Sequence, residues 1–172
     1  MPKSSASMTG VVTMKIASLL CGAIASLVVT ATVPAQGRAK VEFLNSGKVV
    51  PANLPFSEAV RVGDTLYLSG QIGVEPGTLK LVPGGLAAET RQTMNNIRTT
   101  LEAHGYAMRD LVKCTVMLAD MSKWSDFNAV YKAFFADRFP ARSAVGANGL
   151  ALGAQVEIEC IAAAGDDGGA PK

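Results

Sequence analysis

Two segments in the C-terminal half of the chain alternate regularly between apolar and polar residues, and they constrain the fold more than any other feature. The first, "LVKCTVMLAD", begins at residue 111, and its apolar set is Val112, Cys114, Val116 and Leu118. The second, "QVEIECIAA", covers 155–163, and it sets Val156, Ile158 and Cys160 against Glu157 and Glu159. Since successive residues of a strand point to opposite faces, both segments are predicted to be strands with one face in the core.

Shorter strands and two helices complete the expected elements. The strands are predicted around 41–45, 57–62, 65–70 and 142–147. Between the second and third of these, Gly63-Asp64 has the composition of a two-residue hairpin turn. The helices are predicted over 86–104, closed by Gly105 in a left-handed conformation, and over roughly 123–137.

Each predicted helix has one apolar stripe at steps of three and four residues. In the first helix the stripe consists of Ala87, Thr90, Met94, Ile97 and Leu101. In the second it consists of Trp124, Phe127, Tyr131 and Phe134. A single stripe per helix indicates that each helix packs on a sheet by one side.

The resulting order, β-β-β-α-β-α-β-β, predicts an α+β fold in which both helices cover one face of a mixed sheet. The second face of the sheet has no helix to cover it, and it would carry Thr115, Met117, Glu157 and Glu159. A homo-oligomer that packs sheet edges or faces around a symmetry axis would bury this face and create shared clefts. We therefore expect an oligomer.

The N-terminal stretch has the outline of a secretory signal peptide. Lys15 precedes an apolar run over 16–33, and small residues follow it. Cleavage is expected after Ala35, with Ala39 as the second choice. The alternative is an uncleaved membrane anchor, but Ser, Gly, Ala and Thr dilute the run, which reaches only the lower limit of spanning length. The sequence leaves open whether translation begins at Met1 or Met14.

Removal of a leader over 1–35 defines the rest of the chain. Residues 40–164 are expected to form one domain and residues 165–172 a flexible tail, in an exported, periplasmic or secreted protein that is not stably inserted in a membrane. Cleavage takes out Lys3 and Lys15 and leaves 14 basic and 14 acidic side chains. A neutral chain with few aromatic residues offers no footprint for nucleic acid.

The histidine and cysteine residues indicate whether the chain could bind a metal ion or form a disulfide. His104 is the one histidine, and no cluster of Cys and His has the spacing of a metal site, so neither a metal nor a cofactor is expected. Cys114 and Cys160 both lie in apolar alternating segments and resemble small buried hydrophobic residues. Whether they are free or paired stays open, although an exported protein would permit a disulfide.

Arg142, in "RFPARSAV", is a charged side chain at the start of a short apolar strand, where it needs a partner. One interpretation is an ion pair with Glu157 or Glu159 on a neighbouring strand. The other is that the guanidinium grips a small carboxylate by two parallel hydrogen bonds. If Glu157 faces the same cleft, its carboxylate could orient or deprotonate a water beside a bound electrophile, whereas Glu159 is interpreted as a solvated strand residue.

A second candidate is "LSGQIG" over 68–73, which places Ser69, Gly70 and Gly73 at a strand end. There a bare backbone N–H could approach a ligand, although a tight turn explains the same residues. The sequence contains no nucleophile elbow, P-loop or dinucleotide-binding fingerprint.

Six blocks, in this order and spacing, resemble the Rid family of YjgF-like reactive intermediate deaminases. They are "FSEAVRVGDTLYLSGQIG", "TMNNIRTTLEAHG", "DLVKCTVMLADM", "FNAVYKAFF", "FPARSAV" and "VEIECIA", and the resemblance spans residues 40 to 164. It implies a chorismate-mutase-like fold of the bacillus type, assembled as a homotrimer with three clefts at the subunit interfaces. It also implies cofactor-independent hydrolysis of 2-imino acids, such as 2-iminobutanoate and 2-iminopropanoate, to 2-keto acids and ammonia.

The resemblance also implies roles for single residues. Arg142 would hold the substrate carboxylate and Glu157 would position the attacking water. Ser69 and Gly70 would line the cleft together with Asn128.

The chain departs from the family pattern at three places. Phe56 stands where many members carry tyrosine, Ala144 replaces a frequent cysteine, and Leu150-Ala151 replaces a Leu-Pro pair. The first two changes bear on substrate choice and rate. Loss of the tyrosine hydroxyl motivates an alternative function, a non-catalytic trimeric protein that binds or senses small carboxylates. RNA cleavage, proposed for some relatives, is the least favoured because the mature chain is neutral and lacks a histidine pair.

Overall fold

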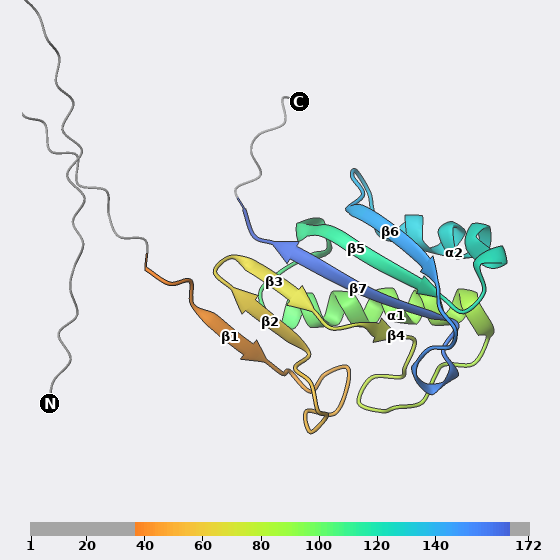
Figure 1. Cartoon of the computed structure of the whole chain (residues 1–172), viewed down its shortest axis with the longest axis horizontal. Helices are drawn as coiled ribbons and strands as arrows, with labels where there is room; N and C mark the ends of the chain where they lie inside the picture. The colour runs from red at the N-terminus through yellow and green to blue at the C-terminus, as the bar shows by residue number, and fades with distance from the viewer. Residues whose placement is uncertain (1–36, 166–172) are drawn as a thin grey trace, which may run out of the picture. The chain divides into compact units, whose positions relative to one another are not determined.

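The computed structural model describes residues 37–165 (Figure 1). The expected leader over 1–35 and the tail after residue 165 lie outside the described residues. Between residues 37 and 165, no helix combines the length and apolarity needed to cross a bilayer.

One mixed sheet forms the centre of the molecule, in the order β1-β2-β3-β7-β5-β6, with β4 paired to β7 (Figure 1). The strands are β1 (Val41–Leu44), β2 (Ala59–Val62), β3 (Thr65–Leu68), β4 (Gln71–Ile72), β5 (Leu111–Leu118), β6 (Ala141–Gly146) and β7 (Val156–Ala163). The β5–β6 pair is parallel and the other pairs are antiparallel. The two strictly alternating segments are therefore adjacent inner strands, which explains why their apolar pattern is the strongest in the sequence.

The helices α1 (Gly85–Ala103) and α2 (Trp124–Tyr131) pack on one face of this sheet. Their stripes meet the inward residues of β5 and β7 in one core, which includes Met94, Ile97, Leu101, Phe127, Tyr131, Cys114, Val116, Ile158 and Cys160. The expected α+β architecture is confirmed, and so is the Gly63-Asp64 turn between β2 and β3.

Two local expectations were wrong, and one short strand was not predicted. The α-helix α2 ends at Tyr131 and continues only as a tighter turn over Lys132–Phe134, in which the Phe135 N–H bonds back to Lys132. Ala87 is exposed and lies outside the buried stripe of α1. The short strand β4 was not predicted, because two residues are too few to show a period.

A bulge in β5 corrects the expected face of Val112. The pairing with β7 shifts between Leu111 and Lys113, so the extra residue is forced out of the ladder. Val112 is consequently 47% exposed, and Leu111 is buried instead.

Cys114 and Cys160 lie directly opposite each other on β5 and β7, and a disulfide joins them. Their Cα atoms are 4.1 Å apart. The sequence left this pairing open because alternation assigns a face to each cysteine but does not align two strands.

The face of the sheet opposite the helices has no helix over it. As expected, it carries Thr115, Met117, Glu157 and Glu159, which are cross-strand neighbours on β5 and β7. The same face also presents large exposed apolar side chains, namely Val41, Phe43, Tyr67 and Val145. Exposed apolar side chains gathered on one face are typical of surfaces that contact another molecule.

Candidate functional site

A pocket of about 410 Å³ opens beside β4 and the start of β7. Four of the seven expected site residues line it, and these are Phe56, Ser69, Gly70 and Glu157. The remaining lining residues are Val50, Leu54, Gln71, Ile72, Val74, Leu79, Ala151 and Leu152. The polar groups of the pocket are thus few and surrounded by apolar side chains, which is the usual character of a small-molecule site.

The Glu157 carboxylate lies directly against the backbone of Gly70. Pairing of Ile72 with Glu157 brings the segment before β4 beside this side chain. A Cβ atom built on residue 70 would overlap the carboxylate and would lie 3.0 Å from its Cδ atom. Glycine is therefore required at this position for the carboxylate to occupy its place.

Burial raises the pKa of the Glu157 carboxyl group, and the negative charge of Glu159 raises it further. Glu159 lies two residues along the same strand and is exposed on the same face. A carboxylate with a raised pKa accepts a proton more readily than an ordinary glutamate, which suits it to act on a water molecule.

Ser69 is held in the pocket wall by two hydrogen bonds to the segment before β2. Its Oγ donates to the carbonyl of Ser57 at 2.7 Å, and its N–H donates to the carbonyl of Glu58 at 3.1 Å. Because the hydroxyl proton is used in this way, Ser69 Oγ presents lone pairs to the pocket.

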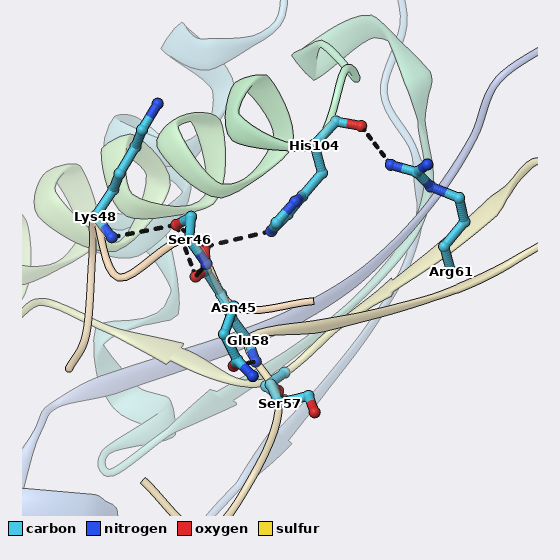
Figure 2. Close-up of polar contacts among 8 residues, drawn as sticks. Asn45, Ser46, Lys48, Ser57, Glu58, Arg61 and His104 are labelled. Carbon is cyan, nitrogen blue, oxygen red and sulfur yellow. Dashed lines mark hydrogen bonds and ion pairs between the residues drawn. The ribbon is translucent and has the colours of Figure 1, made fainter. Parts of the chain in front are cut away.

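The segment that holds Ser69 is itself anchored by the buried side chain of Glu58. Its carboxylate accepts hydrogen bonds from Ser46 N at 2.8 Å and from Ser46 Oγ at 2.7 Å, and its own N–H donates to Asn45 Oδ1 at 2.9 Å. Figure 2 shows these contacts converging on Glu58, with His104 approaching from the end of α1. The result is a rigid wall behind the pocket.

His104, the histidine of the chain, is part of the same cluster. Its Nε2 lies 3.9 Å from Glu58 Oε1 in a buried environment. Burial lowers the pKa of His104 more strongly than the nearby Glu58 charge raises it. Arg61 Nη2 donates to the His104 carbonyl at 2.8 Å and so satisfies a group at the C-terminal end of α1. Sequence inspection gave no signal for this cluster.

Two buried polar side chains of α1 fix the strands around the pocket. Asn96 Nδ2 donates to the carbonyls of Ile72 and Val74, each at 3.0 Å. Glu89 Oε2 accepts from the N–H of Gln155 at 2.8 Å, just before β7. These bonds place β4 and the first residues of β7 relative to the helix layer.

Arg142 lies on the helix side of the sheet, away from this pocket. It is directly opposite Cys114, and its guanidinium carbon is 4.6 Å from the ring centres of both Trp124 and Tyr131 and 5.7 Å from that of Phe127. Aromatic faces stabilise a cation without neutralising it. Burial raises the pKa of the Tyr131 phenol, and the charge of Arg142 acts in the opposite direction.

The ion pair considered for Arg142 is not formed in the described part of the chain. No carboxylate between residues 37 and 165 lies within 4.0 Å of its guanidinium. Glu157 and Glu159 are on the next strand but one and on the other face of the sheet. The structural interpretation of Arg142 as their partner is therefore wrong.

Ala144 and Asn128 also lie outside the pocket. Ala144 is opposite Val116 on the same face as Arg142, and it packs against the core. Asn128 is half-buried on α2, the helix that supplies the aromatic rings around Arg142. The seven expected site residues thus form two groups, one in the pocket and one at β6 and α2. Among residues 37–165, no three His, Cys, Asp or Glu side chains are close enough to hold a metal ion.

The chain is similar to a known family and to named relatives over most of its described length. The sequence pattern of the family described as Endoribonuclease L-PSP matches residues 47–164. A Bos taurus protein named 2-iminobutanoate/2-iminopropanoate deaminase is 44% identical over 124 residues, which cover 72% of this chain and 90% of the relative.

Solved structures share the whole fold. The YjgF gene product of Escherichia coli is 34% identical, with a TM-score of 0.66 over 71% of this chain and 98% of that chain. TdcF of Escherichia coli with bound serine is 29% identical, with a TM-score of 0.67 over 72% of this chain and 99% of that chain. The expected chorismate-mutase-like fold is confirmed by this likeness.

Proposed function

Because the chain belongs to the Endoribonuclease L-PSP family and its curated relatives include proteins named as imine deaminases, we propose that it hydrolyses 2-imino acids to 2-keto acids and ammonia. The observation that carries this proposal is the half-buried Glu157 carboxylate, with a raised pKa, in a largely apolar pocket. The named substrates of the relatives are 2-iminobutanoate and 2-iminopropanoate.

In this proposal Arg142 binds the substrate carboxylate. Its guanidinium is held between aromatic rings, and it has no carboxylate partner within residues 37–165, so its charge remains available to an anion. A guanidinium can bind a carboxylate through two parallel hydrogen bonds, which fixes the orientation of the substrate. The bound serine of TdcF, which carries an α-carboxylate, is consistent with this ligand class.

The site needs a second copy of the chain, because Arg142 and Glu157 leave opposite faces of one sheet. We propose the homotrimer that the family resemblance implies, in which Arg142 of one subunit faces the Glu157 pocket of its neighbour. The large exposed apolar side chains on the uncovered sheet face support an assembly of this kind.

The reaction needs little chemical assistance. Glu157 takes a proton from a water as the water oxygen adds to the imine carbon, and it passes this proton to the nitrogen, which gives a carbinolamine. The hydroxyl proton of the carbinolamine is then transferred through Glu157 to the nitrogen as the C–N bond breaks, so that ammonia leaves and the oxygen remains as the keto group. Holding the imine and the water together converts a bimolecular hydration into an oriented one.

A coupled assay tests the proposal. An amino-acid oxidase and its substrate supply the imine, and the release of keto acid is timed with and without the protein. We expect acceleration with the wild type, none with Arg142→Ala, and about a 100-fold lower kcat with Glu157→Gln. Arg142→Lys keeps the positive charge but cannot form the two parallel hydrogen bonds of a guanidinium, and it serves as the matched variant. A wild type no faster than Arg142→Ala would contradict the proposal.

One observation favours the alternative of a non-catalytic carboxylate-binding protein. Phe56 lines the pocket and brings no hydroxyl group near Glu157. If the protein only binds carboxylates, keto-acid binding would depend on Arg142, whereas imines would be hydrolysed no faster with the protein than in buffer alone. The endoribonuclease activity in the family description is supported less well, because His104 is buried beside Glu58 and is not a lining residue of the pocket.

We propose further that the protein is exported to an oxidising compartment. The signal-like leader and the Cys114–Cys160 disulfide support this, since disulfides persist mainly outside the reducing cytosol. Expression from Met1 followed by fractionation and N-terminal sequencing tests it. A mature protein that begins at Gln36 or Lys40 in the extracytoplasmic fraction is expected, and an intact leader in the cytosol would contradict it.

A further inference from the structure

The pocket beside Glu157 is larger than the smallest 2-imino acids require. It measures about 410 Å³. A non-hydrogen atom of an organic acid occupies less than the roughly 30 Å³ that a water takes in the liquid, so the six-atom imino acid from alanine fills roughly 180 Å³ at most. By the same reasoning the twelve-atom imino acid from phenylalanine fills roughly 360 Å³ at most. Within one subunit, the pocket therefore has room for a bulky side chain.

The lining of the pocket combines a few polar groups with many apolar side chains. The polar groups belong to Glu157, Ser69 and Gln71, and the backbone of Gly70 lies beside them. The large apolar side chains of the lining are Val50, Leu54, Phe56, Ile72, Val74, Leu79 and Leu152. A ligand that presents its reacting carbon to Glu157 would place an attached hydrocarbon group among these side chains.

Three of these apolar residues stand at the mouth of the pocket and are exposed in the single chain. Phe56 is 48% exposed, Leu79 is 47% exposed and Leu152 is 56% exposed. They come from three segments far apart in the sequence, yet all contact one cavity. Exposed apolar groups gathered around a cavity are typical of ligand-binding grooves as well as of subunit contacts, and the test below distinguishes the two.

Leu152 gives a second, independent indication. It has a φ of +58°, and it is the one residue other than glycine with a positive φ between residues 37 and 165. Leucine is disfavoured in this left-handed conformation, for which glycine or asparagine is usual. The next residue, Gly153, also has a positive φ, and there the residue is a glycine. Leu152 adopts this conformation while lining the pocket, which makes its side chain a candidate for a specificity role.

We propose that this pocket selects 2-imino acids with a branched or aromatic apolar side chain, such as those formed from leucine or phenylalanine, over those with a methyl or ethyl group. The inference rests on the proposed imine hydrolysis and adds the substrate class. Leu152 is its principal specificity residue, together with Leu79 and Phe56. Each contacts the substrate side chain and none contacts the reacting atoms.

The test compares imines that an amino-acid oxidase generates from alanine, 2-aminobutanoate, leucine and phenylalanine. For the wild type we expect a kcat/KM at least about tenfold higher with the leucine and phenylalanine imines than with the alanine imine. Leu152→Gly removes the side chain and accepts the positive φ, so it is expected to fold normally. It should lower the leucine-to-alanine ratio of kcat/KM about five- to tenfold.

Val112→Thr is the control, since Val112 is also an exposed apolar residue, lies on a β-bulge and does not line the pocket. It should leave the ratio unchanged. A wild type that prefers the alanine imine, or a Leu152→Gly variant with an unaltered ratio, would overturn the inference while leaving imine hydrolysis intact.

A binding measurement separates this inference from the proposed function. Titration calorimetry with 4-methyl-2-oxopentanoate and with pyruvate should show tighter binding of the former, and Leu152→Gly should reduce the difference. If the wild type hydrolyses no imine faster than Arg142→Ala does, the proposed function and the proposed substrate preference are both wrong. If Leu152→Gly dissociates the oligomer, the apolar rim is a subunit contact and the inference is wrong.

Discussion

The Glu157 carboxylate occupies the space that a side chain on Gly70 would need. Gly70 does not have a positive φ, so alanine is compatible with its backbone, and the clash with the carboxylate is the main effect of a substitution. Gly70→Ala is therefore a steric probe of where the carboxylate must be.

We expect Gly70→Ala to lower kcat about 100-fold with little change in melting temperature, since a displacement of about 1 Å at a reacting group has an effect of this size. Gly165→Ala, where an added Cβ meets nothing within 4 Å, is the control. Equal activity of Gly70→Ala and wild type would show that the observed carboxylate position is not the working one.

Because Arg142 and Glu157 lie on opposite faces of the sheet, mixed oligomers should restore activity that neither variant has alone. Arg142→Ala and Glu157→Gln subunits are unfolded together, refolded together and assayed. If each site takes one residue from each of two subunits, about a quarter of the sites regain both groups. A mixture no more active than its components would refute a shared site.

The raised pKa of Glu157 predicts the acidic limb of the pH–rate profile. A general base works only when it is deprotonated. On acidification, kcat/KM should therefore begin to fall at a pH above the usual pKa range of a glutamate. Glu159→Gln removes the neighbouring negative charge and should move this limb to lower pH. Lys113→Gln is a control on the same face, and a limb that stays in place in Glu159→Gln would argue against Glu157 as the titrating base.

His104 predicts a loss of stability on mild acidification. Burial lowers its pKa in the folded protein, so the unfolded chain binds a proton first as the pH falls. The stability should be complete above about pH 6.5, the ordinary histidine pKa, and should decline below it as pH approaches the lowered folded value.

Chemical denaturation of wild type and His104→Gln between pH 7.5 and 5 measures this effect. His104→Gln should have a flatter dependence, because the chain contains no other histidine. Parallel curves for the two proteins would mean that the buried ring does not titrate in this range.

Reduction of the Cys114–Cys160 bond should destabilise the domain by about 4 kcal/mol, the chain-entropy value for residues 46 apart in sequence. Thermal melts with and without a reductant measure this, and a fall of about 15 °C is expected. Tryptic peptides 114–123 and 143–172 should migrate as one linked species before reduction. Detection of only the separate peptides in unreduced protein would rule out the bond.

Most of the fold could be predicted from the sequence because its strands and helices differ strongly in period. The alternation of β5 and β7 and the stripes of α1 and α2 assign one inward side to each element. The bulge at Val112 and the two-residue β4 could not be foreseen, since each depends on pairing with β7.

The residues of the candidate site were predicted, as was a cleft between subunits, but the positions of these residues within one chain were not. Alternation indicates on which side of its own strand Glu157 lies, but it does not order the strands, and the distance from Arg142 depends on that order. The rings around Arg142 were predicted as core residues of α2 and not as partners of a cation. Glu58 and His104 are distant in sequence and follow no shared pattern, so only the folded chain brings them together.

The bond between Cys114 and Cys160 excludes one kind of misfolding, a shift in register between β5 and β7. While the sulfurs are joined, β5 and β7 cannot slide past each other by one position. Such a slide would exchange inside and outside along a strand, turning the Glu157 carboxylate into the helix layer and its apolar neighbours toward water. Oxidation thereby fixes which face of each central strand points outward, and with it the outward orientation of the carboxylate on which the proposed hydrolysis depends.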